Sequence, residues 1–171
     1  AQSPLVRYIS WNGPMQGQVS GETATAVFPS SNVYPTVVGA PIVWASGITG
    51  KGVTVAVLDS GVTSKTDFST AKKPIKTRIL YDKNFGSVMH LLNINVSMTP
   101  NDLFGHSTHV AGIIGSNGVT SLGKYIGVAP EVNFINLRVS DLQGMAYEAD
   151  MLSALEWVYT NREEYKIRVI N

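Results

Sequence analysis

The strongest constraint on the fold is a short apolar run, residues 53–58, that ends directly in Asp59. The run is rich in β-branched residues and has no polar alternation, which indicates a strand buried on both faces of a parallel sheet. Functional groups in such sheets gather at the carboxyl ends of the strands, and Asp59 stands at that end. The alternative is that Asp59, Ser60 and Gly61 form an ordinary turn.

The rest of the pattern indicates strands that alternate with helices. Residues 77–81, 132–139 and 167–170 are expected to be further strands. Residues 147–161 are expected to be a helix, because apolar side chains recur along one face. This order predicts an α/β fold with a parallel sheet between helices.

Two shorter helices are expected at residues 37–45 and 109–114. Gly112 lies in the second region and Gly115 directly follows it, and each Gly costs about 1 kcal/mol relative to Ala inside a helix. We therefore expect another segment to approach this helix closely. Residues 85–100 show no clean period and are expected to form a surface excursion.

Composition excludes several kinds of chemistry. The 171 residues contain no cysteine, so disulfides, thiolate metal sites and a cysteine nucleophile cannot be built. Thirteen basic and twelve acidic residues leave a formal charge of +1, and nothing indicates a nucleic acid or an anionic membrane as partner. No segment approaches the roughly 18 apolar residues that span a bilayer, and no signal peptide is visible. A secreted protein whose signal has been removed fits, and so does a cytoplasmic one.

A second chemical feature is the pair His106 and His109, set among small residues at the start of a helix. Histidine is the usual general base near neutral pH, and the first turn of a buried helix would hold its ring rigidly. Either histidine could instead be an ordinary core residue. A shared metal ion is the weakest interpretation, because zinc helices place their histidines at i and i+4 and no third ligand stands at suitable spacing.

Taken together, these segments resemble the subtilisin-like serine peptidases, or subtilases. In that family a buried strand ends in Asp-Ser-Gly and a helix opens with His-Gly-Thr-His-Val-Ala-Gly, and residues 52–61 and 105–112 are similar to these motifs. Further similar motifs follow in the family's order at residues 126–130, 136–139, 156–157 and 168–171. The resemblance covers residues 37–171 and implies the family's three-layer α/β fold, of which this chain holds the first part.

The resemblance implies catalytic roles for Asp59 and His106, which match the family's triad Asp and His. His106 would take the proton from a serine hydroxyl that attacks a peptide carbonyl, while Asp59 would accept a hydrogen bond from the other ring nitrogen. Asp59 must stay ionised although partly buried, so further donors are expected near it. His109 matches a non-catalytic histidine of the family. This chemistry requires no cofactor.

The resemblance also implies a binding site for a polypeptide substrate. Gly144, Met145 and Ala146 fall where the family has an edge strand that pairs with the substrate backbone. Met151 is similar in position to a residue that lines a hydrophobic pocket. The alternative is a surface loop followed by a methionine that faces the core.

Two departures from the family concern Ser107 and the loop at residues 115–125. Ser107 replaces the usual Gly after the triad His and is expected to be a tolerated variant. Asp67 and Asn117 resemble two ligands of a structural calcium site that the family commonly has in this region. The loop is longer than usual, and an ordinary turn is the other interpretation of Asp67.

The family's Gly-Thr-Ser-x-Ala segment does not occur, and neither does its oxyanion Asn, so this chain alone is expected to be inactive. Residues 1–36 are interpreted as an N-terminal arm or propeptide remnant with one or two short strands near residues 5–9 and 26–28. Residues 37–171 are interpreted as the N-terminal portion of the catalytic domain.

Three explanations stay open for the missing serine. The chain could be one piece of a nicked enzyme, completed by a C-terminal segment that carries the Ser and the Asn. It could be a truncated product, or a non-catalytic pseudoprotease that binds peptides. An end inside an expected strand favours the first two. The family resemblance also leads us to expect a secreted or extracellular protein.

Overall fold

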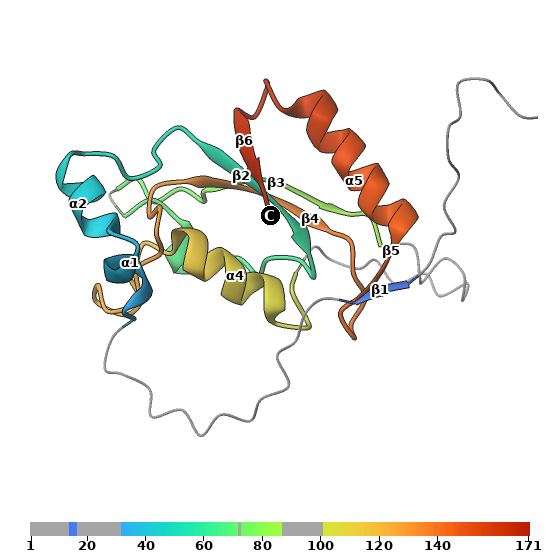
Figure 1. The fold of residues 1–171 in the computed structure, drawn as a ribbon, viewed down its shortest axis with the longest axis horizontal. Coiled ribbons are helices and arrows are strands. Elements are labelled where there is room, and N and C mark those ends of the chain that lie inside the picture. The colour runs from blue at the N-terminus through green and yellow to red at the C-terminus, as the bar shows by residue number, and fades with distance from the viewer. Residues whose placement is uncertain (1–13, 17–31, 72, 87–100) are drawn as a thin grey trace, which may run out of the picture.

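A parallel sheet of four strands, in the order β3-β4-β2-β6, forms the centre of the molecule (Figure 1). The computed structural model describes residues 14–16, 32–71, 73–86 and 101–171. The strands of this sheet are β2 (Thr54–Asp59), β3 (Ile79–Asn84), β4 (Asn133–Arg138) and β6 (Ile167–Ile170). The parallel sheet expected from the apolar run is confirmed.

Two helices, α4 (His106–Gly115) and α5 (Glu148–Asn161), cover opposite faces of this sheet (Figure 1). Alternate side chains of a strand point to opposite faces. On one face Val57 of β2 belongs to the same buried cluster as Ala111 of α4. On the other, Leu58 belongs to the cluster that contains Ala154 of α5. Burial on both faces explains the uninterrupted apolar run and confirms the three-layer α/β architecture.

A group of stacked aromatic rings holds α5 against the sheet. Trp157 of α5 stacks on Tyr81 of β3 with ring centroids 4.5 Å apart and an interplanar angle of 15°. Tyr165, just before β6, contacts both rings at 5.7 and 5.8 Å. Such ring pairs contribute about 0.5–1.5 kcal/mol beyond the area they bury.

The expected single helix at residues 37–45 is wrong. Two short helices lie there, α1 (Tyr34–Val37) and α2 (Ala40–Ala45). Gly39 separates them with φ of +75°, a left-handed conformation that a helix cannot contain. α1 crosses the interpreted boundary between residues 36 and 37, and that boundary stays a prediction.

Strand β3 begins two residues later than expected, at Ile79 rather than Thr77, and ends at Asn84. Thr77 forms an isolated antiparallel bridge with Ser69 instead, close to the short 3-10 helix η1 (Thr66–Phe68). The bridge ties the segment before β3 back onto the loop that leads from β2.

The close approach expected at α4 is confirmed at Gly115. A Cβ atom on Gly115 would lie 2.6 Å from Val132 and 2.8 Å from the Phe134 ring, closer than packed atoms tolerate. At Gly112 the expectation is wrong as far as the described residues go, because a Cβ atom there would meet none of them within 4 Å.

The second sheet has two strands: β1 (Pro14–Gln16) pairs antiparallel with β5 (Met145–Tyr147). Figure 1 shows β1 beside β5 at the start of α5. The strands expected near residues 5–9 and 26–28, and most of the expected excursion at 85–100, lie outside the described residues.

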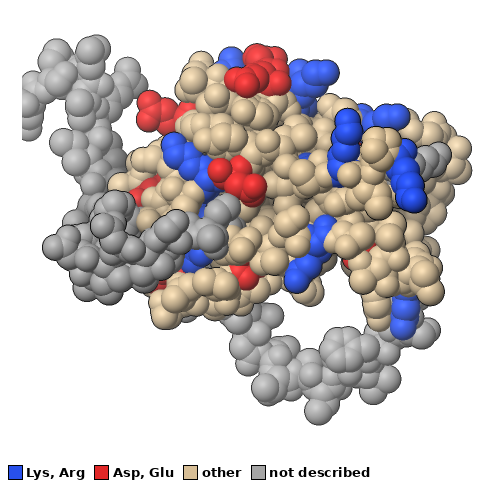
Figure 2. All heavy atoms as spheres, turned by 180° about the vertical axis from the view of Figure 1, so that it is seen from behind, with Lys and Arg blue, Asp and Glu red and all other residues tan. Residues whose placement is uncertain are grey.

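Neither the charged surface nor the helices of the described residues add a further feature. On the face shown in Figure 2, basic and acidic side chains are scattered among uncharged ones, so this face carries no continuous basic surface. Within the described ranges, none of the helices is both long and apolar enough to cross a bilayer.

We predict opposite effects for alanine at the two glycines of α4. Gly115→Ala should destabilise the chain by about 1–3 kcal/mol, because its methyl group overlaps Val132 and Phe134. Gly112→Ala, the matched control, should be neutral or stabilising by up to about 1 kcal/mol, because Ala favours the helix. Urea unfolding of both variants measures the difference, and equal effects would contradict the close packing at Gly115.

Candidate active site

Asp59 and His106 meet at the carboxyl end of the main sheet. Asp59 is the last residue of β2, and His106 is the first residue of α4. His106 Nδ1 lies 2.7 Å from Asp59 Oδ2, although 47 residues separate the two in the chain. The side chains are 32% and 19% exposed, so the pair is accessible from one side and still partly shielded from water.

Local backbone geometry explains why the pair forms. β2 pairs with β4 up to the last residue of β2, and this places Asp59 opposite Arg138 at the carboxyl end of the strands. Gly105, the N-cap residue directly before α4, has φ of +96°, a conformation that is strained for residues with a side chain. The chain therefore turns into the helix directly before His106.

The contact determines what His106 can do. An ionised Asp59 accepts the hydrogen on Nδ1, and this leaves Nε2 as the basic nitrogen on the far side of the ring. The Ser60 N–H donates a second hydrogen bond, 2.6 Å long, to Asp59 Oδ1. Asp59 therefore has a further donor beside His106, as the sequence led us to expect. The arrangement suits a general base that is held by its carboxylate partner.

A second carboxylate, Asp102, lies behind the pair, and no motif marks it in the sequence. It is 9% exposed. The Gly105 N–H and the Ser60 hydroxyl donate to Oδ1 at 2.6 and 2.8 Å, and the Thr108 N–H donates to Oδ2 at 2.7 Å. An Asp shortly before a helix is a capping signal, and it was the one clue available.

The environment keeps Asp102 ionised. Burial alone would raise the pKa of Asp102, but hydrogen bonds from Thr108, Gly105 and Ser60 outweigh burial and hold that pKa below its ordinary value. Arg138, which is fully buried on β4, lies near enough for its own pKa to be raised by the charge of Asp102, although burial lowers it overall.

Two further residues in the first turn of α4, Ser107 and His109, differ in how exposed they are. Ser107 is fully buried, and its Oγ has no hydrogen-bond partner among the described residues. Its N–H donates to Ser60 Oγ at 3.1 Å. His109 is exposed on α4, away from the contact between His106 and Asp59. The structure thus brings one of the two histidines to the carboxylate.

The proposed substrate-binding residues lie in β5, in the turn before it and in α5. Met145 and Ala146 belong to β5, while Gly144 lies in the preceding turn, where a Cβ atom would come 2.8 Å from the Phe104 ring. Met151 is partly buried against the core cluster on the α5 side of the sheet. A role for these residues in substrate binding stays a prediction.

Asp67 and Asn117 do lie close together, but their side chains already hold the loop. Asp67 Oδ1 accepts the Thr120 N–H at 2.8 Å. Asn117 Oδ1 accepts the Val119 N–H at 2.9 Å, and its Nδ2 donates to the Ser69 carbonyl at 2.7 Å. Within the described ranges, no three His, Asp or Glu residues group closely enough to hold a metal ion. These contacts fit a hydrogen-bonded turn, and a calcium site stays a prediction.

A buried cation, Arg78, lies close to Asp67 and donates hydrogen bonds to the surrounding backbone. Its guanidinium donates to the carbonyls of Asp67, Ser69, Gly115 and Val132, which belong to three separate segments. Burial lowers the pKa of Arg78 to about 10, so it remains charged at neutral pH. The guanidinium therefore gathers four carbonyl oxygens at one point, and those of Asp67 and Ser69 also accept hydrogen bonds from Asn117.

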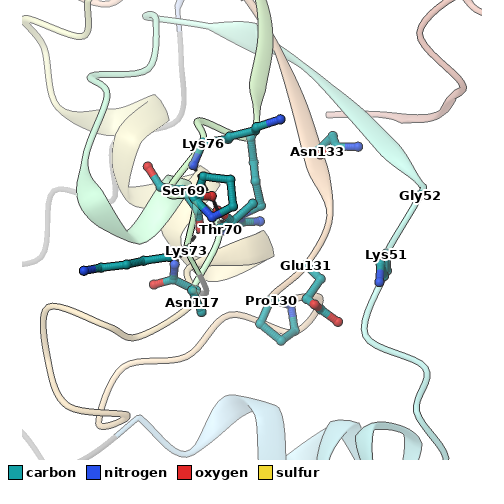
Figure 3. Close-up of a pocket in the computed structure, with 13 residues that line it drawn as sticks. Lys51, Gly52, Ser69, Thr70, Lys73, Lys76, Asn117, Pro130, Glu131 and Asn133 are labelled. Atoms are coloured by element: carbon teal, nitrogen blue, oxygen red, sulfur yellow. Dashed lines mark hydrogen bonds between the residues drawn. The ribbon is translucent and has the colours of Figure 1, made fainter.

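A cavity of about 770 Å³ lies beside this region (Figure 3). Its lining includes Gly52 and Asn133, which stand where β2 and β4 begin. It is therefore at the opposite end of the strands from Asp59. Figure 3 shows Lys51 and Lys73 on opposite sides of it, with Glu131 between them. The lysines do not converge on a common point, and the cavity is separate from the pair of Asp59 and His106.

The family model described as "Subtilase family" matches residues 50–171. Serine protease AprX of Bacillus subtilis is 37% identical over 117 residues, which are 68% of this chain and 23% of that protein. The major intracellular serine protease of the same organism is 38% identical over 103 residues, 60% of this chain and 28% of that protein.

A third relative is the minor extracellular protease Epr of Bacillus subtilis, which is 31% identical over 121 residues, 70% of this chain and 16% of that protein. The chain thus spans between 16% and 28% of the length of these three relatives. The matched region includes both Asp59 and His106.

We predict that Asp102 makes the free energy of unfolding depend on pH in the acidic range. Because its folded pKa is below the ordinary value, its contribution is complete above about pH 4 and is lost as the pH falls through the folded pKa. Asp102→Asn should therefore destabilise the chain at pH 7, and the difference from wild type should shrink at pH 3. Denaturant unfolding at both pH values tests this, and a constant difference would contradict it.

Proposed function

This chain belongs to the subtilase family, and we propose on that premise that it contributes the Asp and His of an Asp-His-Ser triad to a serine endopeptidase. The observation that carries the proposal is the 2.7 Å contact between His106 Nδ1 and Asp59 Oδ2 at the end of a buried parallel strand. The relatives named serine proteases support the same class of activity.

The proposed reaction assigns one step to each group. His106 Nε2 accepts the proton as a serine oxygen attacks the peptide carbonyl, and then gives that proton to the leaving amine. Asp59 holds the ring in the required tautomer and stabilises the imidazolium. A water molecule, activated by His106 in the same way, then hydrolyses the acyl-enzyme ester. The serine and the oxyanion Asn would come from a segment outside these 171 residues.

The proposed polypeptide substrate would add a strand to β5, using the backbone of Gly144, Met145 and Ala146. Ala146 also forms an antiparallel bridge with Ser140 on its other side. β1 pairs with the remaining edge of β5, Met15 opposite Ala146. This supports the proposal that residues 1–36 are a propeptide remnant or arm, because β1 covers the edge that a substrate would need.

Secretion is also part of the proposal, with the signal removed. The printed names of the relatives point both ways, since one is called extracellular and another intracellular. A structural calcium ion near Asp67 remains an optional part of the proposal that the catalytic chemistry does not require.

Labelling with a serine-directed fluorophosphonate tests the proposed activity. The complete native protein should label, and its intact mass should locate the label on a segment outside this chain. Asp59→Asn should lower kcat by about 10⁴, the size of loss seen when the catalytic Asp of serine proteases is replaced, because the imidazole loses its tautomer partner.

Glu163→Gln is a suitable control, because the side chain of Glu163 is exposed and its ion pairs with described residues are long, at 3.6 and 3.8 Å. It should leave labelling and kcat unchanged. A native protein of 18.4 kDa that never labels would sink the protease proposal and favour a peptide-binding pseudoprotease.

Removal of β1 should open the edge of β5 in the active protein. Deletion of residues 1–17 should lower KM for a peptide substrate, by about tenfold if β1 occupies the edge nine-tenths of the time, with kcat unchanged. Deletion of residues 1–12 keeps β1 and is the matched control. If both deletions have the same effect, coverage by β1 does not compete with substrate.

A further inference from the structure

Asp102 acts as the cap of α4, although it lies outside the helix. The residue at the N-cap position, Gly105, has no side chain and makes no side-chain capping bond. Asp102 takes over this role, since it accepts the N–H groups of Gly105 and Thr108 in the first turn. Its negative charge also lies at the positive end of the helix dipole. His106 lies between Gly105 and Thr108, the two residues whose N–H groups Asp102 accepts.

The same carboxylate reaches the other catalytic residue through Ser60. The Ser60 hydroxyl donates to Asp102 Oδ1 at 2.8 Å and accepts the Ser107 N–H at 3.1 Å. The Ser60 N–H in turn donates to Asp59 Oδ1 at 2.6 Å. Ser60 and Ser107 are completely buried, so water cannot replace these bonds without a rearrangement. The network therefore joins the end of β2 to the start of α4.

Further contacts hold Asp102 itself. Its N–H donates to Thr63 Oγ1 at 3.2 Å, and Thr63 N–H donates to Thr108 Oγ1 at 3.1 Å. Arg138 Nη1 donates to the carbonyl of Asn101, the preceding residue, at 3.1 Å. Backbone and side chain of Asp102 are thus both restrained from several directions.

We propose that Asp102 is a positioning residue for the catalytic pair, holding the ring of His106 against Asp59 through Ser60 and the first turn of α4. This inference rests on the proposed role of His106 as general base. Such a base must be held within about 0.5 Å of its productive position, and a displacement of about 1 Å can cost 10²-fold in rate. Asp102 touches neither substrate nor the reacting atoms.

The rival explanation is that Asp102 stabilises the fold and has no particular effect on His106. Asp102→Asn distinguishes the two explanations. Three donors converge on the two carboxylate oxygens of Asp102, and Asn offers only one acceptor oxygen. Gly115→Ala is the matched control: it should destabilise the protein at the far end of the same helix and leave the first turn intact. Both variants are compared in the complete native protein, at a temperature where each is folded.

The kinetic readout is peptide hydrolysis. Asp102→Asn should lower kcat by at least tenfold and change KM less than twofold, because it displaces the base and leaves the β5 edge unchanged. Gly115→Ala should leave kcat within twofold of wild type. Ser60→Ala should act in the same direction as Asp102→Asn but less strongly, since the bonds to Gly105 and Thr108 remain. Ser60→Ala also decides the question if Asp102→Asn does not fold.

A second readout does not depend on activity. The proton on His106 Nδ1, held at 2.7 Å from Asp59, should give a slowly exchanging, low-field NMR signal in the wild-type protein and in Gly115→Ala. The signal should broaden or disappear in Asp102→Asn. This decides the positioning role even if the protein neither labels nor hydrolyses peptides, which would refute the proposed function alone. An unchanged kcat and signal in Asp102→Asn, or equal losses in Gly115→Ala, would overturn the inference.

Discussion

The parallel pairing of β2 with β4 is the constraint on which the rest of the structure depends. Residues 54–59 pair with residues 133–138 without a break in register, and both strands are almost completely buried. Because the ladder satisfies their backbone groups, neither strand can slide without leaving buried polar groups unpaired. Asp59 therefore leaves the sheet at a defined point. The two faces of this pair also create the surfaces that α4 and α5 cover.

Local patterns predicted the elements built from continuous apolar sequence. The runs at β2 and β4 and the helical period of α5 could be recognised because burial in a parallel sheet or on one helix face leaves a direct signal. Boundaries were harder where tertiary contacts decide them, as at Thr77, which pairs with Ser69 and not with β4. The run at residues 37–45 looked helical, but the left-handed backbone of Gly39 interrupts it. Composition alone does not specify that conformation.

The candidate site shows the same division. Asp59 and His106 were found because the motifs around them resemble those of a known family, and the distance between the two could only come from the structure. Asp102 was missed because its importance lies in three donors from different positions, none of which forms a sequence pattern with it. The carbonyls gathered by Arg78 are equally invisible in sequence, since a carbonyl belongs to every residue alike.

The contact between β1 and β5 also depends on backbone groups that nearly every residue carries. The pairing joins backbone to backbone, and Pro14 stands at the first position of its strand, where the missing N–H is tolerated. Most side chains would allow the same extended pairing at residues 15 and 16. The sequence of this segment can therefore vary at residues 15 and 16 while its backbone still covers the edge of β5.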